Sequence, residues 1–158
     1  VYFVLSGAPE KAADFIEWFE QEFGDDIGEP AFLLYAALAC YRVGSLEKAR
    51  SYLLDAMLSN IYMLPYLCSR PMPRQDMWHS SNWVGPDYIY EIDELLEEPT
   101  NQERKWIATQ FDGELFTMVR EKYVETFRAL QHASDFDTRS RILSEWHDYV
   151  ASVGAKEI

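Results

Sequence analysis

Basic residues are scarce in this sequence: 14 lysines and arginines stand against 27 aspartates and glutamates, for a formal net charge of −13. Nucleic acids and anionic membranes repel such a charge, so we expect neither as a partner. A run of about 20 apolar residues, which a membrane-spanning helix needs, is missing. A cationic start followed by an apolar core is missing too, so no signal peptide is indicated. The chain begins at Val1 inside an apolar run, VYFVLSG, and we therefore expect an upstream segment.

Cysteine is equally scarce. The sequence contains only Cys40 and Cys68, which lie far apart and belong to no metal-binding motif. Cys40 falls on the apolar face of an expected helix, where a free thiol acts as a small hydrophobic side chain. No Asn-x-Ser/Thr glycosylation site is present. These observations favour two reduced cysteines and a cytoplasmic protein.

Strand patterns are also absent, because no segment alternates apolar and polar residues for long enough. The 158 residues are 48% hydrophobic and 15% aromatic, so the chain can bury the core of about one domain. Apolar residues recur with helical spacing along almost the whole chain and predict an all-α fold. The expected helices cover residues 9–23, 30–43, 46–59, 87–98, 101–111, 114–133 and 138–153.

Several of these helices have recognisable start and stop residues. Pro9 suits a first helical turn, where its missing N–H is not needed. Ser45 and Asp87 suit the N-cap position, and Thr100 or Asn101 can cap the helix that follows Pro99. The glycines that we expect to end helices are Gly24, Gly44 and Gly154.

The stretch from residue 30 to 60 has small side chains where the two helices of a hairpin would touch. Gly44 marks the turn, and the larger Leu53 stands between two small residues of the second helix. The small residues are Ala36 and Ala37 on the first helix and Ala49 and Ala56 on the second.

This arrangement resembles the tetratricopeptide repeat. A partial second copy supports the resemblance, because the motif Gly-x-x-Glu-Lys-Ala begins at Gly7 and recurs at Gly44. The family's period is about 34 residues, so the loop around residues 24–29 would carry the extra length. We therefore expect about one and a half repeats, of which the first is truncated.

The resemblance implies an α–α superhelix of helical hairpins that binds another protein or a peptide in a concave groove. The groove is lined by the first helix of each repeat. The corresponding residues here are Leu34, Leu38, Tyr41 and Arg42. The same apolar stripe would also fit a helix whose face is covered by its neighbours. The Asn and Lys residues with which some family members clamp a terminal carboxylate are missing from this helix, so we expect no chaperone-tail receptor.

Three regions are expected within one continuous domain. Residues 1–60 carry the repeats, residues 61–86 a capping segment and an irregular strap, and residues 87–158 a helical extension. Asn60 and the following Pro65, Tyr66 and Leu67 are similar to a segment found after the last repeat in some tetratricopeptide proteins, including relatives of the suppressor of tumorigenicity. This likeness fits a helical cap.

The strap (residues 68–86) is rich in proline and serine, which excludes a regular helix, yet it is unusually apolar. A long irregular segment is either functional or packed on the core. Both alternatives remain open, with Trp78 and Trp83 as its expected contacts. Its apolar residues are Met72, Met77, Trp78 and Trp83.

No motif indicates catalysis. The carboxylate pairs Asp25–Asp26 and Glu97–Glu98 lie at expected helix ends, where acids are commonly solvated. The three histidines, at positions 79, 132 and 147, lack the spacing of metal ligands. No phosphate-binding loop or nucleophile motif occurs. We expect no enzyme, no metal and no cofactor.

We therefore predict a non-catalytic protein-interaction module, a scaffold or adaptor segment, which could also form a homo-oligomer. The alternative is an acidic inhibitor or nucleic-acid mimic that covers a basic surface of its partner. The six acids of residues 87–98 would supply its contact face. An ordinary solvated face explains the same acids.

Overall fold

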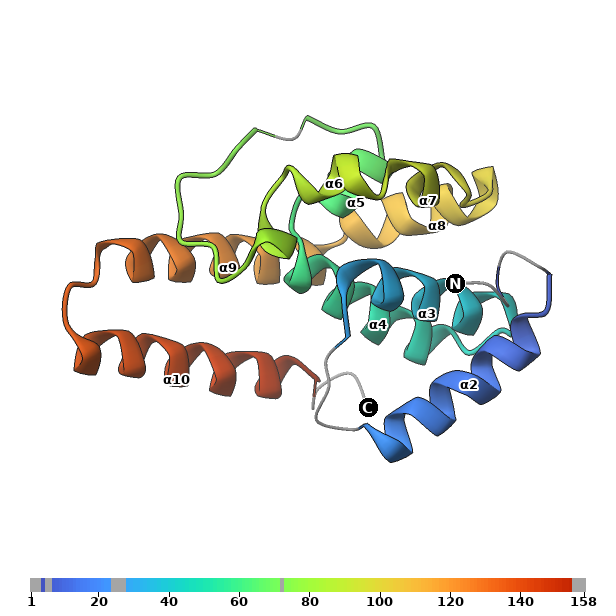
Figure 1. Cartoon of the computed structure of the whole chain (residues 1–158), viewed down its shortest axis with the longest axis horizontal. Coiled ribbons are helices and arrows are strands. Elements are labelled where there is room, and N and C mark those ends of the chain that lie inside the picture. The colour runs from blue at the N-terminus through green and yellow to red at the C-terminus, as the bar shows by residue number, and fades with distance from the viewer. Residues whose placement is uncertain (1–3, 5–6, 24–27, 72, 155–158) are drawn as a thin grey trace.

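The structure, a computed structural model, describes residues 4, 7–23, 28–71 and 73–154. Within these ranges every regular element is a helix, which confirms the all-α prediction (Figure 1). None of the described helices is long and apolar enough to cross a membrane. The elements are α2 (Pro9–Glu22), α3 (Pro30–Arg42), α4 (Leu46–Ser59), α5 (Met63–Leu67), the 3-10 helix η1 (Asn82–Val84), α6 (Tyr88–Glu91), α7 (Asp93–Glu97), α8 (Asn101–Phe111), α9 (Glu114–His132) and α10 (Phe136–Gly154).

Two helical hairpins organise the fold. Figure 1 shows α3 and α4 side by side at the centre, with α2 along the lower side of the molecule. The short helices α5 to α8 lie on the upper side. The long helices α9 and α10 form the second hairpin, at the left, and α9 also contacts α4. Helix α3 is therefore contacted by α2, which precedes it in the sequence, and by α4, which follows it.

The α3–α4 hairpin is packed through small side chains. Ala36 and Ala37 on α3 and Ala49 on α4 are at most 2% exposed. A small side chain lets two helix backbones approach closely, and the buried Leu53 fills the remaining space. Burial extends over most of α3, which is why this helix contains no charged residue before its last position.

The two copies of the Gly-x-x-Glu-Lys-Ala motif have the same local structure. Gly7 has a φ of 74° and Gly44 a φ of 82°, a left-handed conformation that side chains other than glycine rarely adopt. In both copies a helix begins two residues later, at Pro9 and at Leu46. Ser45 occupies the N-cap position of α4 as expected, although its side chain makes no capping hydrogen bond.

The prediction of a single helix over residues 87–98 is wrong. The chain forms two short helices, α6 and α7, which are separated at Ile92. At the end of α7, side chains from other helices satisfy backbone carbonyls: the Tyr35 hydroxyl donates to the Leu95 oxygen at 2.8 Å, and Arg104 Nη2 donates to the Leu96 oxygen at 2.5 Å. The last carbonyls of a helix have no partner within that helix, so these hydrogen bonds hold the end of α7 in place. Asp87 makes no capping hydrogen bond, and its carboxylate pairs with Arg74.

Candidate functional site

The four residues predicted to line a concave groove do not form an open surface. Leu34 and Leu38 are fully buried in the core, with no exposed area. Tyr41 and Arg42 are partly buried and contact α8 of the same chain. Neighbouring helices cover this face of α3, so it offers no free groove in this structure.

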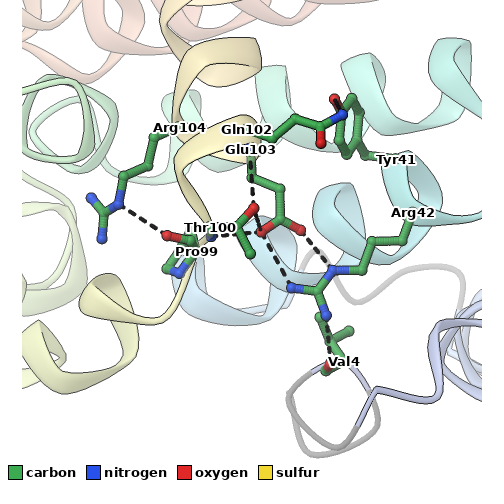
Figure 2. Close-up of polar contacts among 8 residues, drawn as sticks. All are labelled: Val4, Tyr41, Arg42, Pro99, Thr100, Gln102, Glu103 and Arg104. Atoms are coloured by element: carbon green, nitrogen blue, oxygen red, sulfur yellow. Dashed lines mark hydrogen bonds and ion pairs between the residues drawn. The ribbon is translucent and has the colours of Figure 1, made fainter.

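Tyr41 and Arg42 dock α3 onto α8. The Tyr41 ring stacks on Trp106, with 4.6 Å between ring centroids. The Arg42 guanidinium donates from Nε to Glu103 Oε1 at 2.6 Å, and from Nη2 to Glu103 Oε2 at 3.3 Å (Figure 2). Its Nη1 donates to the carbonyl oxygen of Val4. Arg42 therefore links α3 to α8 and to Val4 near the N-terminus.

Glu103 is only 3% exposed and has a second role in the start of α8. Its Oε2 accepts hydrogen bonds from the Thr100 backbone N–H and hydroxyl, both at 2.7 Å, and the Thr100 Oγ1 accepts from the Glu103 N–H (Figure 2). This capping box identifies Thr100, not Asn101, as the N-cap. Burial works to raise the pKa of Glu103, but the hydrogen bonds from Arg42 and Thr100 outweigh it and hold the pKa below its usual value. These contacts of Arg42, Thr100 and Glu103 hold α3 against the start of α8, and we call them the Arg42–Glu103 joint.

The strap is packed on the core along part of its length. The backbone N–H of Trp78 donates to the backbone carbonyl of Phe127 at 3.1 Å, and the rings of the two residues stack with centroids 6.1 Å apart. The Arg139 guanidinium lies over the Trp78 ring. Met77 is buried. Trp83, in contrast, is 51% exposed. Met72 lies outside the described residues.

The structure describes only part of the acids named from the sequence. Glu97 and Glu98 are both exposed, and Asp25–Asp26 lie outside the described residues. In the described part of the chain no group of three or more His, Cys, Asp or Glu side chains could hold a metal ion. Cys40 and Cys68 are free thiols, and burial raises the pKa of both, that of Cys68 to about 11.

The most exposed apolar surface that the described helices gather in one place lies on α2. Phe15, Trp18 and Phe23 are 41%, 48% and 48% exposed. Their rings contact one another, with centroid distances of 5.4 Å between Phe15 and Trp18 and 5.6 Å between Trp18 and Phe23. Phe19 lies between them and packs on Phe32 of α3 at 4.8 Å. We call Phe15, Trp18, Phe19 and Phe23 the aromatic face of α2.

Carboxylates surround this aromatic face. Asp14 and Glu22 each lie four positions from Trp18, one turn away on the helix surface, and both are exposed. The only base in α2 is Lys11. Glu20 pairs with Lys48 of α4 at 2.8 Å and also accepts a hydrogen bond from the Tyr52 hydroxyl, which helps to fix α2 against the α3–α4 hairpin. The exposed acids of the helix are Glu10, Asp14, Glu17, Glu20 and Glu22.

The sequence prediction missed this surface because it assigned one apolar face to α2. The helical spacing of residues 9–23 places Phe15, Phe19 and Phe23 on the same face as Ala12 and Ile16. In the structure Ala12 and Ile16 are buried, while Phe15 and Phe23 point outward. The available signal was the presence of Trp18 beside these phenylalanines, because one helix face cannot bury so wide an apolar arc on a single neighbour.

Comparisons with protein-family models, with curated proteins and with solved structures found no match.

Proposed function

We propose that this chain is a non-catalytic protein-interaction module of tetratricopeptide-like hairpins, and that it binds its partner through the aromatic face of α2. The observation that carries the proposal is a set of half-exposed aromatic rings in mutual contact, bordered by carboxylates. The partner that fits is a basic amphipathic helix of another protein.

The chemistry of the surface supports this partner. Aromatic side chains dominate the energetics of protein interfaces, and a contiguous exposed apolar patch is unusual on a protein that binds nothing. Asp14 and Glu22 flank Trp18 and would pair with lysines or arginines that border an apolar stripe on the partner. The net charge of −13 steers a basic segment toward the chain.

The tetratricopeptide-like part of the proposal is supported by two local features. Gly7 and Gly44 share a left-handed conformation before equivalent helices, and Ala12 and Ala49 are buried at equivalent positions. In such an array α2 would be the second helix of one repeat and α3 and α4 the next repeat. The two free cysteines are consistent with a cytoplasmic module.

An acidic mimic remains the second candidate because the acids between Asp87 and Glu98 are all exposed. Only Asp87 among them has an ion-pair partner in the described part of the chain. Salt separates the two candidates. Binding by an acidic face collapses as salt rises from about 0.1 to about 0.5 M, whereas binding by an aromatic face loses little.

The test is a selection from a displayed library of helical peptides of about 16 residues against the wild-type chain. We expect enriched peptides to combine an apolar stripe with lysine or arginine. A Phe15→Ser/Trp18→Ser variant should bind them more than about tenfold more weakly. Binding that survives in this variant would refute the assignment to α2.

The matched control is Phe136→Ser. Phe136 is 81% exposed at the start of α10 and has no aromatic partner among the described residues. The substitution therefore removes a more exposed ring outside the aromatic face, and it should leave peptide affinity unchanged.

A further inference from the structure

A second feature lies away from α2, where α4, η1, α9 and α10 meet. They line a partly open pocket of about 560 Å³, which is within the usual range for small-ligand pockets. Neither the groove predicted from the sequence nor the proposed function uses this pocket. We call it the aromatic pocket, after the rings that line it: Tyr123, Phe127, Trp146 and Trp83.

Three of these rings, from α9 and α10, form a rigid wall of the pocket. Tyr123 and Phe127 stack at 4.1 Å, and Trp146 meets them edge-on at 5.5 and 6.0 Å. All three side chains are at most 8% exposed. Because their neighbours hold them in place, the wall exists before any ligand arrives, and binding need not order it.

The fourth ring stands at the solvent side of the pocket. Trp83 is 51% exposed and belongs to η1. The fully buried Asn60 fixes this segment, since its Nδ2 donates to the carbonyl oxygens of Trp83 at 2.6 Å and of Gly85 at 3.1 Å. A half-exposed ring on a backbone tied down in this way is positioned to close over a ligand.

The pocket also contains an unpartnered carboxylate. Asp55 lies on α4 among the lining residues and makes no hydrogen bond or ion pair within the described part of the chain. Burial raises the pKa of Asp55 to about 6, so the side chain is ionised at neutral pH at a cost to the folded protein. Asp55 is partly buried, and a partly buried carboxylate without a partner, lining a pocket, is a candidate for binding a ligand.

Among the described residues, no lysine or arginine lines the pocket beside Asp55. The other titratable groups of the described lining residues are Tyr123 on α9 and His147 on α10. A divalent metal would need further carboxylates or thiolates, and the described residues provide no such group. The missing partner is thus a single positive charge that arrives with a ligand.

We propose that the aromatic pocket binds the ammonium group of an organic ligand, with Asp55 as the counter-ion and the aromatic rings as the wall around the cation and its alkyl chain. Ammonium groups are attracted both to aromatic faces and to a poorly solvated carboxylate. The ligand is either a lysine side chain of a peptide or a free alkyl amine. This proposal is independent of the aromatic face of α2.

The experiment is an NMR titration of the tryptophan indole N–H signals with hexylammonium, and in parallel with hexanol, its neutral counterpart. We expect hexylammonium to shift the signals of Trp83 and Trp146, to leave that of Trp18 unchanged, and to bind at least about tenfold more tightly than hexanol. Equal affinity for the two probes would overturn the proposal.

Asp55→Asn keeps the shape of the side chain and removes its charge. This variant should lose the preference for hexylammonium while binding hexanol as before. Asp148→Asn is the matched control, since Asp148 is exposed on α10 next to His147 but does not line the pocket. If Asp55→Asn and Asp148→Asn reduce hexylammonium affinity equally, general acidity explains binding and the proposal fails.

Two further arms identify the source of the ammonium. Titration with N-acetyl-lysine methylamide reports a peptide side chain, and titration with putrescine reports a free amine. A preference for either one supports the ammonium site and names its ligand class, whereas no shift with either or with hexylammonium refutes it. Trp83→Ala, whose side chain is half exposed, should weaken every ammonium probe without unfolding the chain.

Discussion

Arg42 and Glu103, 61 positions apart in the sequence, form a two-point ion pair that joins α3 to α8. The carboxylate of this pair is almost completely buried, and the guanidinium is about one-quarter exposed. The arginine predicted from the sequence as a contact for a partner protein thus contacts its own chain.

Arg42→Met should strongly destabilise the fold. The substitution leaves Glu103 buried without a counter-ion, and we expect the free energy of unfolding in urea at neutral pH to fall by about 3 kcal/mol. Arg42→Met/Glu103→Gln should recover part of this loss, because glutamine carries no charge. A double variant that is less stable than the single one would show that the charge of Glu103 is not the cause.

The same pair predicts a pH dependence. Because the pKa of Glu103 in the folded chain lies below its ordinary value of 4.5, its ionised form adds stability above that pH. This contribution is lost as the pH falls through the folded-state pKa. The stability difference between wild type and Arg42→Met should therefore narrow in urea unfolding below about pH 4.

Ionisation of Asp55 should lower the stability of the folded chain, whereas ionisation of Glu103 raises it. The folded-state pKa of Asp55, about 6, lies above the ordinary value of 3.8, so the folded chain holds the proton more tightly. Ionisation then costs stability as the pH rises from 3.8 to about 6. Asp55→Asn should be more stable than wild type at pH above 7 by on the order of 2 kcal/mol, and the gap should shrink near pH 4 in urea titrations. Parallel stability curves for wild type and variant would contradict this.

Helix α2 offers a matched pair of substitutions. Ile16 is 3% exposed, so Ile16→Ala should cost about 3 kcal/mol. Trp18 is 48% exposed, so Trp18→Ser should cost less than about 1 kcal/mol and should reduce the binding of a fluorescent hydrophobic dye. Thermal unfolding with dye fluorescence measures both effects. A larger loss of stability for Trp18→Ser than for Ile16→Ala would show that the ring has a structural role.

Gly7 and Gly44, the first residues of the two motif copies, should lose similar amounts of stability when they are replaced by alanine. Gly7→Ala and Gly44→Ala each place a side chain in a left-handed conformation and should cost about 1 kcal/mol in chemical unfolding. Gly85→Ala is the control, since Gly85 has no positive φ and a Cβ there would meet only the Asn82 carbonyl oxygen at 3.5 Å. Its substitution should change stability by less than about 0.5 kcal/mol.

Local patterns predicted most helices because their causes are local. Pro9 and Pro30 start helices by their ring geometry, Gly44 ends one by its left-handed backbone, and Thr100 caps α8 through residues three positions apart. The break at Ile92 has no such signal. The hydrogen bonds from Tyr35 and Arg104 to the last turn of α7 also come from elsewhere in the fold, so local spacing could not predict them.

The candidate sites were harder to predict for the same reason. Whether Leu38 faces a groove or the core depends on which helices pack on this face of α3, and sequence spacing on α3 is the same in both cases. The pocket around Asp55 joins side chains from four elements. One available signal was the acid itself, which interrupts the apolar residues Leu54, Ala56 and Met57 of α4.

The Arg42–Glu103 joint also has a consequence for the order of events during synthesis. The ribosome makes the chain from its N-terminus, so α3 exists before the residue that neutralises its arginine. At about 5 to 20 residues per second, the 61 intervening positions take about 3 to 12 s to make. During this interval the face of α3 that α8 later covers is open, and Arg42 is solvated. The first hairpin therefore completes its packing only after α8 has left the ribosome, and a chaperone that binds nascent chains would find its apolar target in α3.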